Sequence, residues 1–156
     1  MSVQIEELDL GARGIAEAVV ELQRASYRVE ADLLGARTLP ALKESPRRLR
    51  RTRERFLGAY EGERLVGAVS WKRSSGLVDI HRLVVHPDRF RRGIAGALLD
   101  ALDLRLPDAQ RWVVATGAAN EPARRLYERH GFVPVAEQLV DGTISIVTYE
   151  RRAGSA

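Results

Sequence analysis

The chain has 156 residues, of which 45% are hydrophobic and 29% charged, as expected for one globular domain with a sizeable core. It has no cysteine, which excludes disulfides and thiolate metal sites, and it shows neither a signal peptide nor the ~18 apolar residues of a membrane span. We therefore expect a cytoplasmic protein with no membrane partner, and the formal net charge of +4 at pH 7 does not by itself indicate a nucleic-acid partner.

The beginning of the chain predicts a strand, a helix and an irregular segment. Apolar and polar residues alternate over 3–8, which indicates a strand, and apolar residues then recur at helical spacing over about 12–29. Gly35 and Pro40 interrupt any regular pattern over 30–44. We expect a loop or short helix there that exposes its leucines.

A basic run follows this irregular segment. Ser45 and Pro46 have the residue types of an N-cap and a first helical position, so a short helix is predicted to run to about Arg53. Arginines crowd the stretch 47–55, and a nucleic-acid-binding surface is one interpretation of it. A solvated helix face is the interpretation that we favour, because a leucine, a threonine and a glutamate interrupt the run.

The middle of the chain predicts a meander of three strands. They are expected over 56–60, 65–72 and 77–85, with glycine-containing turns between them. The remaining elements are a helix over 94–106, a strand over 111–116, a helix from Asn120 to about His130, and strands over 132–140 and 144–151 joined by Asp141-Gly142. The mixture indicates an α+β or mixed α/β domain over 1–152, followed by a polar tail over 153–156.

The junction between the third meander strand and the next helix has the features of a phosphate-binding turn. The strand stops at His86-Pro87, a loop dense in arginine and glycine follows, and an apolar helix begins near Ile94. Backbone N–H groups and the positive end of a helix dipole can hold an anion at such a turn, and Gly93 would let it approach closely. The turn matches neither the dinucleotide fingerprint nor the P-loop pattern.

Two motifs carry a resemblance to a known family. Gly93 and Ala95 fill the fourth and sixth places of (Gln/Arg)-x-x-Gly-x-(Gly/Ala), although Phe90 occupies the first place. The stretch from Asn120 to Phe132 matches N-x-x-A-x-x-[FL]-Y-x-x-x-G-F. The chain thus resembles the GNAT superfamily of acetyl-CoA-dependent N-acetyltransferases over nearly its whole length. The resemblance implies a central, mostly antiparallel mixed sheet of about seven strands flanked by about four helices.

The resemblance also implies how acetyl-CoA would be held. The pyrophosphate would lie on the glycine loop, the pantetheine arm would pair with the backbone of the third meander strand, and Asn120 would add an amide contact or act as a plain N-cap. No metal is implied. The residues placed on the cofactor are Leu83, Val84, Val85, Phe90, Arg91, Arg92, Gly93, Ile94, Ala95, Gly96, Asn120, Ala123 and Arg124.

Three residues are candidates for the chemistry. In the family, the tyrosine that matches Tyr127 protonates the departing thiolate, and a phenol can donate a proton at neutral pH. Direct attack also requires a neutral amine. Strand alternation places Asp79 and His81 on one face together with Leu83 and Val85, and either Asp79, through a water, or His81 could remove the proton. Bulk water is the third possibility.

The acceptor is the least defined part of the sequence-based hypothesis. The family binds it with the first helix pair and their connection. Glu44 and Glu54 lie in this region, and their carboxylates could attract an amine. The residues predicted to line its site are Tyr27, Glu30, Leu33 and Leu34. The predicted activity is direct transfer of an acetyl group to a primary amine of a small molecule, peptide or protein in a ternary complex, by a monomer or homodimer. A non-catalytic acyl-CoA sensor on the same fold is the alternative.

Overall fold

The computed structural model describes residues 3–35, 44–140, 142 and 144–154. Seven strands and four α-helices are present in the described part, as the sequence predicts. In chain order the elements are β1 (Gln4–Glu7), α1 (Ile15–Leu34), α2 (Pro46–Arg51), β2 (Arg55–Glu61), β3 (Arg64–Ser74), β4 (Leu77–Val85), the 3-10 helix η2 (Pro87–Arg89), α3 (Ile94–Arg105), β5 (Arg111–Gly117), α4 (Glu121–Arg129), β6 (Val133–Val140) and β7 (Ile144–Arg152).

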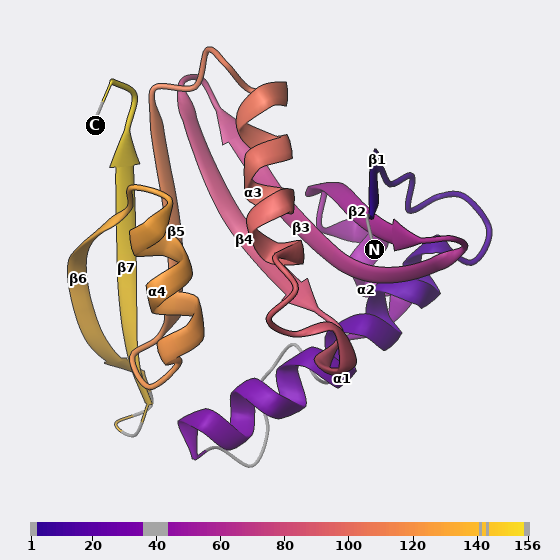
Figure 1. Ribbon diagram of the computed structural model, residues 1–156, viewed down its shortest axis with the longest axis horizontal. Coiled ribbons are helices and arrows are strands. Elements are labelled where there is room, and N and C mark those ends of the chain that lie inside the picture. The colour runs from indigo at the N-terminus through magenta and orange to yellow at the C-terminus, as the bar shows by residue number, and fades with distance from the viewer. Residues whose placement is uncertain (1–2, 36–43, 141, 143, 155–156) are drawn as a thin grey trace.

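The strands form one mixed sheet in the order β1-β2-β3-β4-β5-β7-β6. Every neighbouring pair is antiparallel except β4 and β5, which are parallel, so the predicted fold class is confirmed. The β4–β5 ladder is short, because it joins only Leu77–Asp79 to Arg111–Val113. Beyond that point the two strands diverge (Figure 1), and the sheet divides into two halves.

Helices cover the two faces of the sheet differently. Buried residues of α3 and α4, among them Leu98 and Tyr127, pack in one cluster against the inner strands. The opposite face of the N-terminal half packs against α1 and α2, with Val19 and Leu49 in a second cluster. A third cluster joins Leu22 of α1 to the centre of β3 and β4. The point of divergence between β4 and β5 therefore lies among elements from both layers.

A bulge in β4 corrects the predicted arrangement of side chains. Trp71 of β3 pairs with Ile80, but the preceding Ser70 pairs with Arg82, so His81 is an extra residue on β4. One extra residue reverses the alternation of every position after it. The prediction that Asp79 and His81 share a face with Leu83 and Val85 is therefore wrong: Leu83 and Val85 pack toward α3, whereas His81 contacts Asp79 and a residue preceding β2.

Helix α1 is longer than the sequence suggested. It continues through the first residues of the predicted loop to Leu34, and Gly35 then ends it in a left-handed conformation with φ 70°. The backbone N–H of Gly35 donates to the carbonyls of Ala31 and Asp32, which satisfies the open end of the helix. Glu30, Leu33 and Leu34 are thus helical. Leu39 and Leu42 lie outside the described residues.

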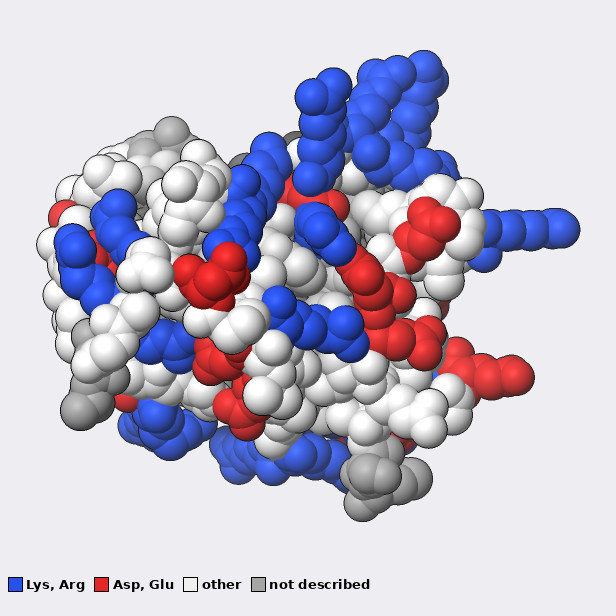
Figure 2. Space-filling model, turned by 90° about the horizontal axis from the view of Figure 1, so that it is seen from above, with Lys and Arg blue, Asp and Glu red and all other residues white. Residues whose placement is uncertain are grey.

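Helix α2 carries the basic run, as predicted. The Ser45 side chain accepts from the backbone N–H of Arg48 at 3.2 Å, and Leu49 is fully buried. Arg50 forms an ion pair with Glu17 on α1. On the face of the molecule shown in Figure 2, acidic side chains lie between basic ones. The run thus serves as the outer face of a packed helix.

Packing between β3 and α3 leads to a testable prediction. A Cβ added at Gly67 would lie 2.8 Å from Ile94 Cγ2 and 3.2 Å from Leu98 Cδ1. We expect Gly67→Ala to lower the free energy of unfolding by about 1–3 kcal/mol, because α3 would be forced away from the sheet. At Gly96 the nearest atom is His130 Cε1 at an ordinary 3.5 Å.

Gly96→Ala is the matched control on the same helix. Because alanine favours a helix over glycine, we expect Gly96→Ala to raise the free energy of unfolding by about 0.5–1 kcal/mol. Chemical denaturation of both variants checks this. Equal effects of the two substitutions would contradict the proposed tight contact at Gly67.

Candidate active site

The site begins where β4 and β5 separate. On its other edge β4 remains paired with β3, with Val84 opposite Ala68 and Val85 opposite Gly67. Among the described strands, none pairs with the β5-facing edge of β4 after Asp79. A free strand edge can bind a peptide-like chain through its N–H and C=O groups. The structure thus places the predicted backbone segment Leu83–Val85 at such an edge.

The loop after β4 has the geometry of an anion-binding turn. Arg91 and Gly93 both adopt left-handed conformations, with φ 65° and 76°. Gly93 is the N-cap of α3, and its carbonyl accepts the N–H of Ala97. The N–H groups of Ile94, Ala95 and Gly96 precede this first helical bond, and such groups lack partners within their own helix. Left-handed residues in a loop turn successive N–H groups toward one concave side, which suits phosphate.

The side chains of this loop divide into anchors and free groups. Arg89 Nε donates to both carboxylate oxygens of Glu61 at 2.9 Å, which fastens the loop to β2. Arg91 and Arg92 are exposed, and neither forms an ion pair with another described residue. Phe90, at the place where the family motif has Gln or Arg, is 41% exposed. The mobile positive charge at the turn therefore comes from Arg91 and Arg92.

Helix α4 begins at Asn120, whose side-chain oxygen accepts the N–H of Ala123 at 3.3 Å. Asn120 is therefore an N-cap, and its amide nitrogen remains a donor. Arg124 donates from Nε to the Tyr149 hydroxyl at 2.8 Å and from Nη1 to the Ala118 carbonyl at 3.0 Å. These bonds hold α4 against β7 and the turn before it.

Tyr127 lies on the buried face of α4 and is only 5% exposed. Its ring packs at 5.8 Å between ring centroids against both Phe132 and Tyr149. The Tyr149 hydroxyl accepts from Arg124 and donates to Glu128, whereas the Tyr127 hydroxyl has no hydrogen-bond partner among the described residues. Burial, together with the nearby charge of Glu30, raises the pKa of the Tyr127 phenol. A protonated hydroxyl on a buried ring, with no hydrogen-bond partner among the described residues, is available to act on a ligand.

Helix α1 brings two predicted acceptor residues close to this tyrosine. Tyr27 packs against the cluster formed by Leu22, Ala68 and Val84, and burial raises the pKa of its phenol. Burial also raises the pKa of Glu30, and the Asn120 side chain partly opposes this. Leu33 and Leu34 follow on the same helix. Residues from α1 and α4, far apart in sequence, therefore meet at one place.

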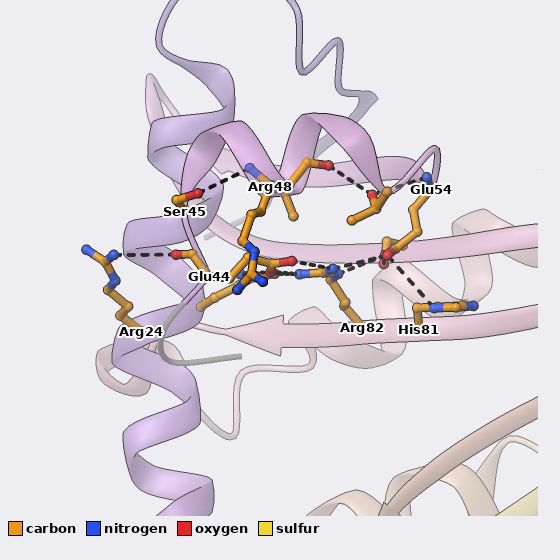
Figure 3. Close-up of polar contacts among 11 residues, drawn as sticks. Arg24, Glu44, Ser45, Arg48, Glu54, His81 and Arg82 are labelled. Carbon is orange, nitrogen blue, oxygen red and sulfur yellow. Dashed lines mark hydrogen bonds and ion pairs between the residues drawn. The ribbon is translucent and has the colours of Figure 1, made fainter. Parts of the chain in front are cut away.

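Figure 3 shows a charge network around Arg82 that the sequence did not reveal, and its charges contribute to the pKa of Tyr27. Arg82 donates to Glu54 from Nε at 2.8 Å and from Nη2 at 3.1 Å, to Glu44 from both terminal nitrogens, and to Gln23 at 2.7 Å. Ser70 Oγ donates to Glu54 at 2.6 Å. The sequence signal is an arginine beside the apolar run at the end of β4, but its partners come from three separate segments.

Both candidate bases contact this network. His81 Nε2 lies 3.4 Å from Asp79 Oδ2, and His81 Nδ1 lies 3.8 Å from Glu54 Oε2. Burial alone would raise the pKa of Glu54, but hydrogen bonds from Arg82 and Ser70 outweigh it and lower that pKa. His81 thus lies between two carboxylates at the bulge of β4.

A metal site and a membrane-spanning helix are both absent from the described residues. No group of three or more His, Asp or Glu side chains there is arranged to hold a metal ion. None of the helices in this part of the chain is long and apolar enough to cross a membrane.

Comparison with known proteins agrees with this geometry. Residues 52–134 match the family model described as acetyltransferase (GNAT) domain. The UPF0157 protein YqkA of Bacillus subtilis (strain 168) is 36% identical over 128 residues, which are 82% of this chain and 37% of that protein. The chain therefore spans little more than a third of the length of this curated relative.

Solved structures show the same fold at low sequence identity. PaiA N-acetyltransferase from Thermoplasma acidophilum, in complex with coenzyme A, is 20% identical with a TM-score of 0.77, over 97% of this chain and 99% of that chain. The ribosomal-protein-S18-alanine N-acetyltransferase from Escherichia coli is 16% identical, also with a TM-score of 0.77, over 99% and 96% of the two chains.

The buried network leads to a prediction for stability. A carboxyl whose pKa is lowered by folding stabilises the protein above its unfolded pKa and loses that contribution as the pH falls through its folded pKa. We expect Glu54→Gln to lower the free energy of unfolding at pH 7 by about 1–3 kcal/mol. The difference from wild type should shrink below about pH 4.5, the ordinary pKa of a glutamate.

Glu17→Gln provides the control, because Glu17 pairs with Arg50 at the surface. Exposed ion pairs contribute little, so this variant should unfold much like wild type at every pH. Chemical denaturation between pH 3.5 and 7 measures both variants. A constant penalty for Glu54→Gln across this range would show that its charge is not what stabilises the network.

Proposed function

Because the chain belongs to the GNAT acetyltransferase family, we propose that it transfers an acetyl group from acetyl-CoA to a primary amine by direct attack in a ternary complex. One observation carries the proposal. The Tyr127 ring is buried, its hydroxyl has no hydrogen-bond partner among the described residues, and the charge of Glu30 contributes to its raised pKa. Amide formation from a thioester needs a proton donor for the leaving thiolate, and Tyr127 can supply that proton.

The residues present suit coenzyme A. The N–H groups at the start of α3, with Arg91 and Arg92 beside them, offer donors and positive charge to its phosphates. The unpaired edge at Leu83–Val85 offers backbone groups to the amide-containing pantetheine arm. Asn120, at the start of α4, offers the donor of its side-chain amide. The complex of PaiA with coenzyme A supports the choice of this cofactor.

The proposed chemistry uses one proton acceptor and one proton donor. His81, held beside Asp79, removes a proton from the acceptor ammonium, and the neutral amine nitrogen forms a bond to the acetyl carbonyl carbon. As the carbon–sulfur bond breaks, Tyr127 donates its proton to the leaving sulfur. Loss of the second amine proton to solvent, release of the proton from His81 and return of a proton to Tyr127 complete the cycle. The products are an N-acetylated amine and the free thiol of coenzyme A.

A thiol-release assay with acetyl-CoA and a panel of amines and peptides tests this function. The proposal expects release that depends on the acceptor, together with saturable binding of acetyl-CoA by isothermal titration. Binding without release against the whole panel would support the acyl-CoA sensor instead. Absence of binding at high micromolar acetyl-CoA would contradict both functions.

Substitution of the tyrosine tests its role directly. Tyr127→Phe keeps the ring that packs against Phe132 and Tyr149 and removes only the proton donor. We expect kcat to fall by about a hundredfold or more, with little change in the dissociation constant of acetyl-CoA. Tyr60→Phe removes a hydroxyl in the separate α1–α2 cluster and should leave kcat unchanged. Unchanged turnover in Tyr127→Phe would remove this residue from the mechanism.

A further inference from the structure

The inward face of α1 changes character along its length. Residues spaced three or four apart lie on one stripe of a helix. In α1 the stripe begins with the fully buried Ala16 and Val20, continues with the buried amide of Gln23, and ends with Tyr27 and Glu30. A helix face that only completes a core stays apolar. The polar end of this stripe therefore faces something other than the core.

The surroundings of Glu30 indicate what that is. The charge of Glu30 contributes to the raised pKa of Tyr127, and the Asn120 side-chain amide partly offsets the rise that burial causes in the pKa of Glu30. Tyr27 lies one turn earlier than Glu30 on the same helix. These neighbours are two phenols and an amide, and the ion pairs of the described residues do not include Glu30. A half-buried carboxylate with such neighbours can bind a cation well, because a bound ammonium would offset the cost of its burial.

The wider charge balance favours a cationic acceptor. Arg82 is the buried basic group of this region, and both Glu44 and Glu54 already pair with it. Arg24 is exposed and donates to the main-chain carbonyl of Glu44. Asp79 adds a further carboxylate beside His81. Counted with Glu30, the region therefore holds four carboxylates and one buried arginine. An acceptor with its own carboxylate close to the amine would meet net negative charge there, and Arg82 is already paired.

We propose that Glu30 binds the ammonium of the acceptor beside Tyr127 and thereby selects amines that carry no carboxylate next to the nitrogen. This inference rests on the proposed function and names its substrate class. It gives Glu30 a role in acceptor specificity that is separate from the proton transfers assigned to His81 and Tyr127. Simple amines, amino-acid amides and peptide N-termini belong to the class, and free α-amino acids do not.

Paired acceptors with one skeleton test the inference. Thiol release is measured with α-amino-acid amides and with the corresponding free amino acids, over a series of side chains. For wild type we expect kcat/KM for the amide to exceed that for the acid by at least about tenfold. In Glu30→Gln we expect the amide value to fall by about tenfold or more, so that the preference approaches one.

Two further variants separate specificity from structure. Glu21→Gln removes the same charge from the exposed side of the same helix and should keep the wild-type preference. Glu30→Asp retains a carboxylate and should keep part of the wild-type preference for amides. The dissociation constant of acetyl-CoA should be the same in all variants, which checks that each one folds.

The outcomes distinguish the two proposals. Turnover by wild type with a preference that Glu30→Gln leaves unchanged would overturn the inference and leave the proposed function standing. A preference for free amino acids would do the same. Absence of acceptor-dependent turnover in wild type would overturn the proposed function and the inference with it.

Discussion

Arg82 holds the N-terminal half of this protein together. Its side chain is only 12% exposed, and it joins β4 to Gln23 of α1, to Glu44 before α2, and to Glu54 before β2. Burial alone would lower the pKa of Arg82, but the two carboxylates outweigh it and raise that pKa. A buried ion network adds little net stability over apolar packing, yet it is costly to leave incomplete. It therefore fixes where α1 and α2 lie relative to β4.

The two sides of the site follow from this constraint and from the short β4–β5 ladder. The divergence of the strands leaves one edge of β4 free, and the left-handed loop residues present the start of α3 at the end of the same strand. At the bulge, close to the point where the β4–β5 ladder ends, His81 contacts the carboxylates of Asp79 and Glu54. Under the proposed function, donor groups for a cofactor and acidic groups for an acceptor lie on the two sides of Tyr127.

Local signals predicted much of this arrangement. Helical and strand periodicity, with glycine turns, predicted seven strands and four helices, and the match to a family motif singled out Asn120 and Tyr127. The faces of β4 could not be predicted, because one extra residue reverses a period of two. The end of α1 could not be predicted to the residue, because Gly35 and Pro40 interrupt the regular pattern over 30–44. The Arg82 network depends on contacts 28 to 59 residues apart in sequence, which no local pattern encodes.

A crystal structure of the protein with coenzyme A tests the central claim most directly, because it locates the cofactor and its sulfur. The account predicts that the pyrophosphate accepts hydrogen bonds from the N–H groups at the start of α3. It also predicts that the pantetheine arm follows the free edge of β4 at Leu83–Val85, with the sulfur within reach of the Tyr127 hydroxyl. A cofactor bound elsewhere, or a sulfur directed away from Tyr127, would contradict it.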